Sequence, residues 1–72
     1  MAVLPVVSAP QAVRAFQKLG YVFDHQTGSH MILYHPSGKH LSIPYRREIA
    51  RGTLRALIRS AGISVEEFLD LL

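Results

Sequence analysis

Cysteine is absent from this 72-residue sequence. The absence excludes a disulfide scaffold and a zinc site built on thiolates, and it fits a reducing compartment, so we expect a cytoplasmic protein. Long apolar runs are also missing. The longest, Met1–Val7, is broken by Pro5 and has no basic segment before it, so we expect neither a signal peptide nor a membrane span. We expect one domain over residues 1–72, with no membrane partner.

Acidic residues are scarce and unevenly placed. Eight Lys and Arg outnumber five Asp and Glu, which gives a net charge of +3. All eight basic residues lie at or before Arg59, where the acidic ones are Asp24 and Glu48, so residues 1–59 carry +6 and the remainder carries −3. A basic region of this kind attracts polyanions such as RNA, although basic residues that only solubilise a small domain give the same composition.

The first helix is predicted from signals at both of its ends. Ser8 can cap the helix and Gln11 completes a capping box, while a proline in the first turn tolerates the missing amide donor. Gly20 supplies the stop. The pattern therefore predicts a helix over Ala9–Leu19.

A change to β-forming residues follows this helix. Short turns containing Gly or Pro separate three apolar runs, and Pro44, which cannot donate to a ladder, marks the end of the third run. The pattern predicts an antiparallel meander of three short strands that includes Tyr21–Phe23, Met31–Tyr34 and Leu41–Ile43.

Helical spacing returns after the strands. A second helix is predicted from Gly62 in the capping position and from apolar residues at i, i+3, i+4 and i+7, which are Leu54, Leu57, Ile58 and Ala61. A capping box at Ser64–Glu67 opens a short last helix, whose apolar stretch Phe68–Leu72 either packs back or meets a partner chain. The order is α-β-β-β-α with a short extra helix, an α+β fold in the order of a double-stranded-RNA-binding domain.

Four histidines stand five residues apart, at His25, His30, His35 and His40. The spacing invites a metal-site interpretation, but side chains alternate between the two faces of a strand, so His30 and His35 cannot converge on one ion if one strand holds both. We therefore expect no metal ion and no other cofactor.

His30 follows the turn residues Gly28-Ser29 and is expected to begin the second strand. It would share a strand face with Ile32 and Tyr34, opposite the face of Met31 and Leu33. Both faces are apolar, so periodicity does not decide which one packs on the helices. Histidine exchanges a proton near neutral pH, yet at a strand start it is ordinarily a structural residue, and the sequence alone leaves both roles open.

Arginines are concentrated around the second helix. Arg51, Arg55 and Arg59 are four residues apart and form one ridge, and Arg46-Arg47 precede it. Guanidinium groups suit a phosphate backbone because they offer bidentate donors and release counterions, although a solvated helix face looks similar. Two further side chains, Tyr34 and Tyr45, could stack on unpaired bases or pack half-buried.

Several segments in this order carry a family resemblance, which covers nearly the whole chain. They are Leu4–Ser8, Leu19–Tyr21, Gly28–His30, His35–Gly38, Ile43-Pro44, Glu48–Arg55 and Ala61–Ser64. The sequence resembles the HicA (YcfA-like) toxins of bacterial and archaeal toxin–antitoxin modules. The resemblance implies a fold like the double-stranded-RNA-binding domain and an endoribonuclease that cleaves mRNA until a HicB antitoxin covers it. It also implies that His30, in the Gly-Ser-His segment, is catalytic.

Two positions differ from many relatives, which have a further histidine where this chain has Met31 and Arg46.

The expected reaction is metal-independent: His30 acts as general base on the RNA 2′-hydroxyl. The general acid stays open between His30 itself in a later step, another residue and water. We expect RNA to be bound by Ser29, Lys39, Arg46, Arg47, Arg51 and Arg55, and the free toxin to be monomeric. The alternative is a non-catalytic RNA-binding module.

Overall fold

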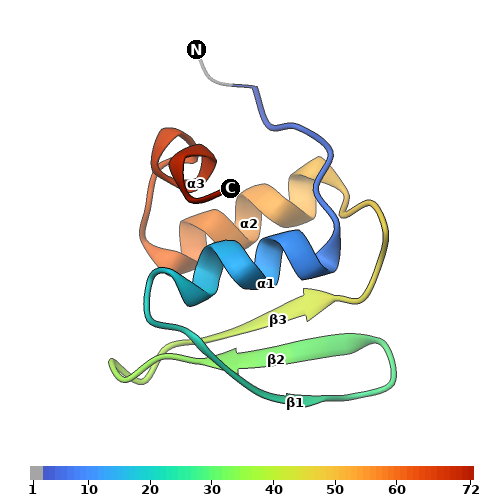
Figure 1. Ribbon diagram of the computed structural model, residues 1–72, viewed down its shortest axis with the longest axis vertical. Helices are drawn as coiled ribbons and strands as arrows, with labels where there is room; N and C mark the ends of the chain where they lie inside the picture. Colours follow the sequence, from blue (N-terminus) through green and yellow to red (C-terminus); the bar gives the residue numbers. More distant parts are fainter. Residues whose placement is uncertain (1–2) are drawn as a thin grey trace.

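The computed structural model describes residues 3–72, so Met1 and Ala2 of the apolar run Met1–Val7 lie outside the described residues. Figure 1 shows two layers, a sheet covered on one side by helices. The elements in chain order are α1 (Ala9–Gln17), β1 (Val22–Gln26), β2 (His30–Tyr34), β3 (His40–Pro44), α2 (Arg51–Ala61) and α3 (Val65–Leu71). This arrangement confirms the predicted α+β fold with three antiparallel strands and an extra C-terminal helix.

The sheet has the order β1-β2-β3, with β2 paired antiparallel to both neighbours. Along β2, Leu33 is fully buried and Met31 packs against the core, whereas Tyr34 is exposed. The helices therefore cover the Met31 and Leu33 side. We call the opposite side the open face. By strand register its residues are Val22, His25, His30, Ile32, Tyr34, His40, Ser42 and Pro44.

Helix α1 begins where the sequence predicts. Ser8 Oγ accepts from the Gln11 amide at 3.3 Å and Gln11 Oε1 accepts from the Ser8 amide at 2.9 Å, so the capping box is present. The helix ends at Gln17, two residues earlier than expected, because Leu19 and Gly20 form tighter i to i−3 bonds and Gly20 has a φ of 100°. The next residue, predicted as strand, is the buried Tyr21, which precedes β1.

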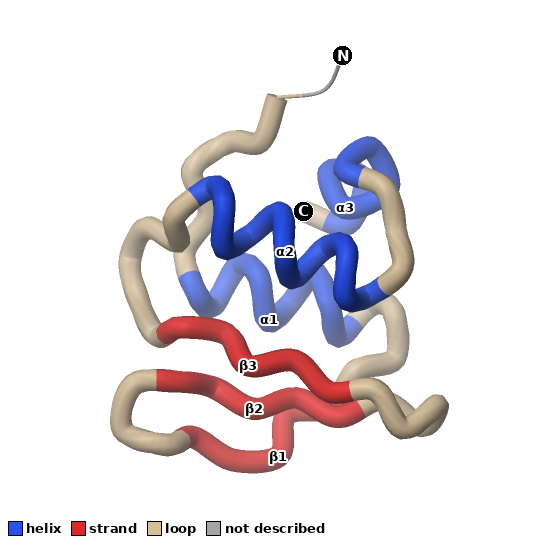
Figure 2. Tube along the Cα trace, turned by 180° about the vertical axis from the view of Figure 1, so that it is seen from behind, coloured by secondary structure: helices blue, strands red, loops and turns tan. Residues whose placement is uncertain are grey.

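Helices α2 and α3 follow their predicted signals. Leu54, Leu57 and Ile58 are buried, and Gly62 closes α2 in the left-handed conformation with a φ of 77°. Helix α3 starts at the predicted capping box and lies beside α1 and α2, on the side away from the sheet (Figure 2). None of the described helices is long and apolar enough to cross a membrane.

The last helix packs back on the domain. Phe68 is fully buried, with its ring 5.3 Å from that of Phe16, and Lys18 Nζ donates to the Leu71 carbonyl at 2.9 Å. Of the two interpretations of this apolar stretch, the structure confirms the one in which it completes the core.

The connection between β3 and α2 is held by backbone hydrogen bonds to distant segments. The Ala9 amide donates to the Arg46 carbonyl, the Tyr45 amide to the Ser29 carbonyl, and the Ile49 amide to the Val7 carbonyl, each at 2.9 Å. The connection therefore joins the start of α1, the turn before β2 and the N-terminal segment.

We expect Phe68→Ala to lower the free energy of unfolding by about 3–5 kcal/mol, because it leaves a cavity beneath α3. Urea denaturation followed by circular dichroism measures the loss. Leu72→Ala is the control, because this side chain is 48% exposed. Equal stability of the two variants would mean that α3 does not contribute to the core.

Candidate functional site

His30 lies at the exit of the β1–β2 turn. Thr27 and His30 exchange backbone hydrogen bonds of 2.9 and 3.4 Å, which close the turn around Gly28 and Ser29. His30 is half-buried, and its Nδ1 lies 2.9 Å from Ser29 Oγ. When Nδ1–H donates to this hydroxyl, Nε2 carries a lone pair, so the ring can accept a proton there.

Arg46 and Arg47 lie at the same end of the sheet as His30. His30 is paired with Pro44 across β2 and β3, and the amide of the next residue, Tyr45, donates to the Ser29 carbonyl. Both arginines are exposed and line a shallow pocket of about 310 Å³ together with Ser8, Pro10 and Tyr45. The structure thus brings the backbone of the arginine pair to the same end of the sheet as His30.

The arginines of α2 form the expected exposed ridge, and Arg51 begins the helix. Its Nε donates to the Leu4 carbonyl at 3.0 Å, so part of this guanidinium holds the N-terminal segment. The first turn of α2 has no acidic residue, and its N-cap, Ala50, makes no side-chain bond. The positive end of the helix dipole therefore adds to the charge of Arg51 and Arg55.

Lys39 lies away from this group. It precedes β3, whose first residue His40 is paired with Tyr34 at the far end of β2 from His30. His30 and Tyr34 are four positions apart along β2, roughly 13 Å at the usual rise of a strand. The structure therefore gathers His30, Ser29, Arg46, Arg47 and, through the start of α2, Arg51, whereas Lys39 stands apart.

The sequence model described as "HicA toxin of bacterial toxin-antitoxin" matches residues 9–63 of the chain. The chain belongs to the HicA toxin family. The match spans α1 to the end of α2, and so includes the turn that holds His30 and the connection that holds the arginine pair. A comparison with curated proteins found no match. The HicA family assignment confirms the resemblance and makes this chain the toxin of a toxin–antitoxin pair.

His35 of this HicA toxin has a structural setting. Its Nε2 lies 3.1 Å from the Leu19 carbonyl, and its Nδ1 accepts from the Ser37 amide at 3.0 Å. Both ring nitrogens are thus engaged, and the ring fastens the β2–β3 turn to the end of α1. Gly20 has a φ of 100°, which favours glycine, and a Cβ there would also lie only 3.1 Å from His35 Nε2.

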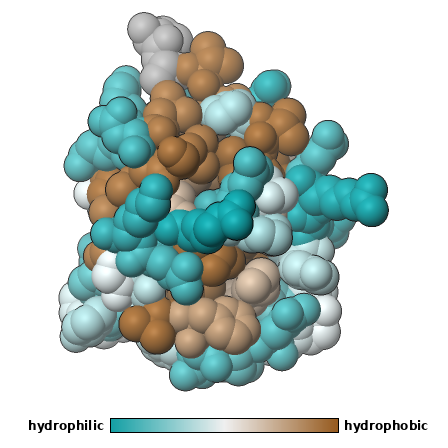
Figure 3. Space-filling view, in the orientation of Figure 1, coloured by the Kyte–Doolittle hydropathy of each residue, from teal (hydrophilic) through white to brown (hydrophobic). Residues whose placement is uncertain are grey.

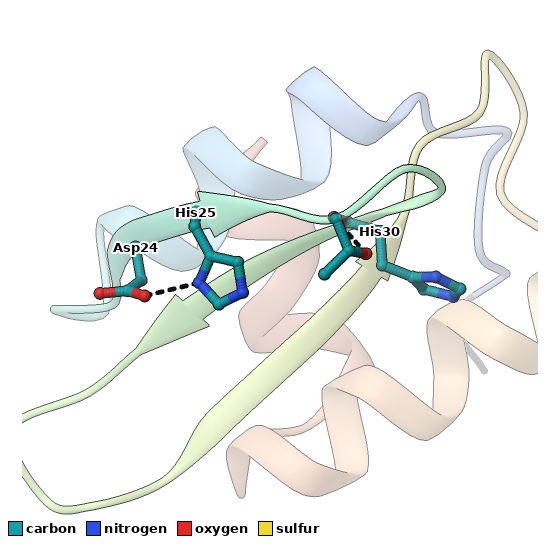
Figure 4. A network of polar contacts seen from close by, with 4 residues as sticks. Asp24, His25 and His30 are labelled. Carbon is teal, nitrogen blue, oxygen red and sulfur yellow. Dashed lines mark hydrogen bonds and ion pairs between the residues drawn. The ribbon is translucent and has the colours of Figure 1, made fainter.

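A polar pair on β1 was not predicted from the sequence. Asp24 Oδ2 lies 2.6 Å from His25 Nδ1 (Figure 4). The register of β1 against β2 shifts between Phe23 and His25, so Asp24 occupies a β-bulge. The only signal in the sequence is that Asp24 and His25 are adjacent. This signal is weak, because the side chains of neighbouring residues on a regular strand point to opposite faces. Within residues 3–72, no group of three side chains is placed to hold a metal ion.

Tyr21 predicts a pH dependence of stability. Its hydroxyl is buried with no partner among residues 3–72, and burial raises the pKa of Tyr21 above the ordinary 10.0. Above about pH 10 the unfolded chain loses the proton first, so the folded state loses stability as the pH rises, whereas below this pH the group contributes no slope.

We expect Tyr21→Phe to raise the free energy of unfolding by about 1 kcal/mol at neutral pH, because it removes an unsatisfied buried group. The advantage should grow in alkaline solution. Urea titrations at about pH 8 and about pH 11 measure both effects. A variant less stable than the wild type at the lower pH would contradict the burial of an unpaired hydroxyl.

Proposed function

We propose that this HicA toxin is an endoribonuclease that cleaves mRNA, with His30 as the general base. The observation that carries the proposal is the position of His30 at the end of the central strand, where the backbone of the connection that holds Arg46 and Arg47 is bonded to the turn before β2. A proton acceptor and two cations at the same end of the sheet match the needs of phosphodiester cleavage. The site of action is the cytoplasm, and a HicB-type antitoxin is the inhibitor.

In the proposed reaction His30 Nε2 takes the proton of a 2′-hydroxyl. The 2′-oxygen then attacks the adjacent phosphorus, the bond to the 5′-oxygen breaks, and the products are a 2′,3′-cyclic phosphate and a 5′-hydroxyl. Before RNA binds, Ser29 Oγ accepts from Nδ1–H, which leaves Nε2 as the nitrogen that takes the proton. Because the RNA supplies its own nucleophile, the reaction needs no metal ion.

The RNA-binding roles follow the placement of the cations. Arg46 and Arg47 stabilise the charge that develops on the phosphate under attack, and Arg51 and Arg55 bind neighbouring phosphates along α2. Ser29 contacts the RNA beside His30. Lys39 can contact the RNA only if the RNA extends along the whole length of β2. Its contribution to RNA affinity should therefore be the smallest of this set.

The antitoxin requires a surface of its own on the monomeric toxin. Figure 3 shows apolar side chains gathered around the N-terminal segment, among hydrophilic neighbours. Val3 and Val6 of this segment are 75% and 56% exposed. Exposed apolar surface of this kind is typical of protein interaction sites and supports a protein partner.

We expect His30→Ala to reduce RNA cleavage about 10²- to 10⁴-fold while RNA affinity is retained. Cleavage of total RNA, the 2′,3′-cyclic ends and growth after induction without antitoxin are the measurements. His40→Ala is the matched control, because this exposed histidine lies at the other end of the sheet. Wild-type activity should persist in EDTA.

Two results would contradict this proposal. Wild-type expression that leaves growth and RNA intact would exclude the nuclease, and so would products that end in a 3′-hydroxyl. If His30→Ala weakens growth inhibition and RNA affinity by the same factor, growth inhibition depends on binding alone. This result would favour the non-catalytic RNA-binding module.

The arginines predict a salt dependence. Each phosphate contact that is removed should flatten the plot of log affinity against log salt by about 0.7 for single-stranded RNA. We expect Arg46→Ala and Arg47→Ala to show this change and Lys39→Ala to show less of it. Titrations of a short RNA at several salt concentrations, with His30→Ala as the common background, measure the slopes. Equal slopes for all three variants would contradict the placement of the RNA.

A further inference from the structure

The Asp24–His25 pair on β1 has no role in the proposed reaction so far. Both side chains are about half exposed, and Asp24 Oδ2 lies 2.6 Å from His25 Nδ1, within reach of a charge-assisted hydrogen bond. His25 donates from Nδ1, which fixes the ring and leaves Nε2 open to solvent. Such a pair has the arrangement of a histidine oriented by a carboxylate for proton transfer.

The β-bulge decides which face of the sheet His25 occupies. Phe23 is opposite the buried Leu33, so its side chain points to the helix side, and a regular strand would return the residue at position 25 to that side. The extra residue, Asp24, shifts the register so that His25 is opposite Ile32. His25 therefore lies on the open face, which is also the face of His30.

On this face His25 and His30 are diagonal neighbours. His25 is opposite Ile32, and His30 is two residues away along β2, so the two residues are diagonal neighbours roughly 7–8 Å apart. One phosphodiester group fits between two imidazoles at this separation. Figure 4 shows the His30 ring turned away from His25, so the productive arrangement requires rotation of this ring on the open face as the RNA binds.

The other histidines do not meet these conditions. Both nitrogens of His35 are engaged by Leu19 and Ser37. His40 shares the open face but is opposite Tyr34, at the far end of β2 from His30. Among the described histidines, His25 is the one that pairs a free Nε2 with a position beside His30.

We propose that His25 is the general acid of the cleavage reaction and that Asp24 is its positioning residue. This inference rests on the proposed endoribonuclease activity. As His30 takes the 2′-hydroxyl proton and the 2′-oxygen bonds to phosphorus, the bond from phosphorus to the 5′-oxygen breaks. Protonated His25 gives its Nε2 proton to that departing oxygen, which leaves as a 5′-hydroxyl. The two histidines then exchange protons with water.

Substitution of the leaving atom tests this assignment. A short RNA whose cleaved linkage has been mapped with the wild-type protein is compared with the same RNA carrying sulfur in place of the 5′-bridging oxygen. A thiolate leaves without a proton, so it needs no general acid. We expect His25→Ala to slow cleavage of the oxygen RNA about 10²-fold or more and to cleave the sulfur RNA at nearly the wild-type rate.

Three further variants, compared on both RNAs, show whether the effect is specific to the general acid. His30→Ala should be slow on both RNAs, and Asp24→Asn should show a smaller loss that the sulfur RNA also removes. His40→Ala should match the wild type on both. His25→Gln replaces His25→Ala if circular dichroism shows that the latter is unfolded.

Each outcome separates the two proposals. Wild-type rates for His25→Ala on the oxygen RNA, or an equal loss on both RNAs, would overturn the role of His25 and leave the nuclease standing. A wild-type protein that cleaves neither RNA would overturn the nuclease itself and the general acid with it.

Discussion

The position of β2 between two antiparallel neighbours is the constraint on which the rest of the molecule depends. Hydrogen bonds on both sides fix its register, and strand alternation then assigns Met31 and Leu33 to the core and His30 to the open face. A slip of one residue would exchange these sets, placing an imidazole against the helices and a core leucine in water. The burial of the apolar side chains therefore also keeps His30 accessible.

Backbone hydrogen bonds determine where the two arginines before α2 lie relative to His30. The arginine pair belongs to a connection with no regular structure of its own, yet its amides and carbonyls are bonded to the turn before β2, the start of α1 and the N-terminal segment. These bonds satisfy polar groups that the connection would otherwise have to leave to solvent. They also hold the backbone of the two arginines at the His30 end of the sheet, without any ion pair to the arginines among the described residues.

Most of the fold could be predicted from the sequence, because capping boxes, helical spacing and a left-handed glycine each involve only residues that are close together in the sequence. The capping serines Ser8 and Ser64 and the closing Gly62 lie where the sequence indicates. The faces of β2 could not be assigned, since both are apolar and only packing distinguishes them. The bulge at Asp24 depends on pairing between strands, so nothing in β1 alone revealed it. The distance of Lys39 from His30 follows from the hairpin, in which the chain reaches Lys39 only after running the length of β2.

The bonds around the connection before α2 also make separate parts of the chain a single cooperative unit. Ala9 and Ile49 are far apart in sequence, but their amides are bonded across the same junction. Opening the junction exposes both amides at once, so their hydrogen exchange reports one local unfolding event. The position of Arg46 and Arg47 therefore depends on the first turn of α1 as much as on the residues next to them in the sequence.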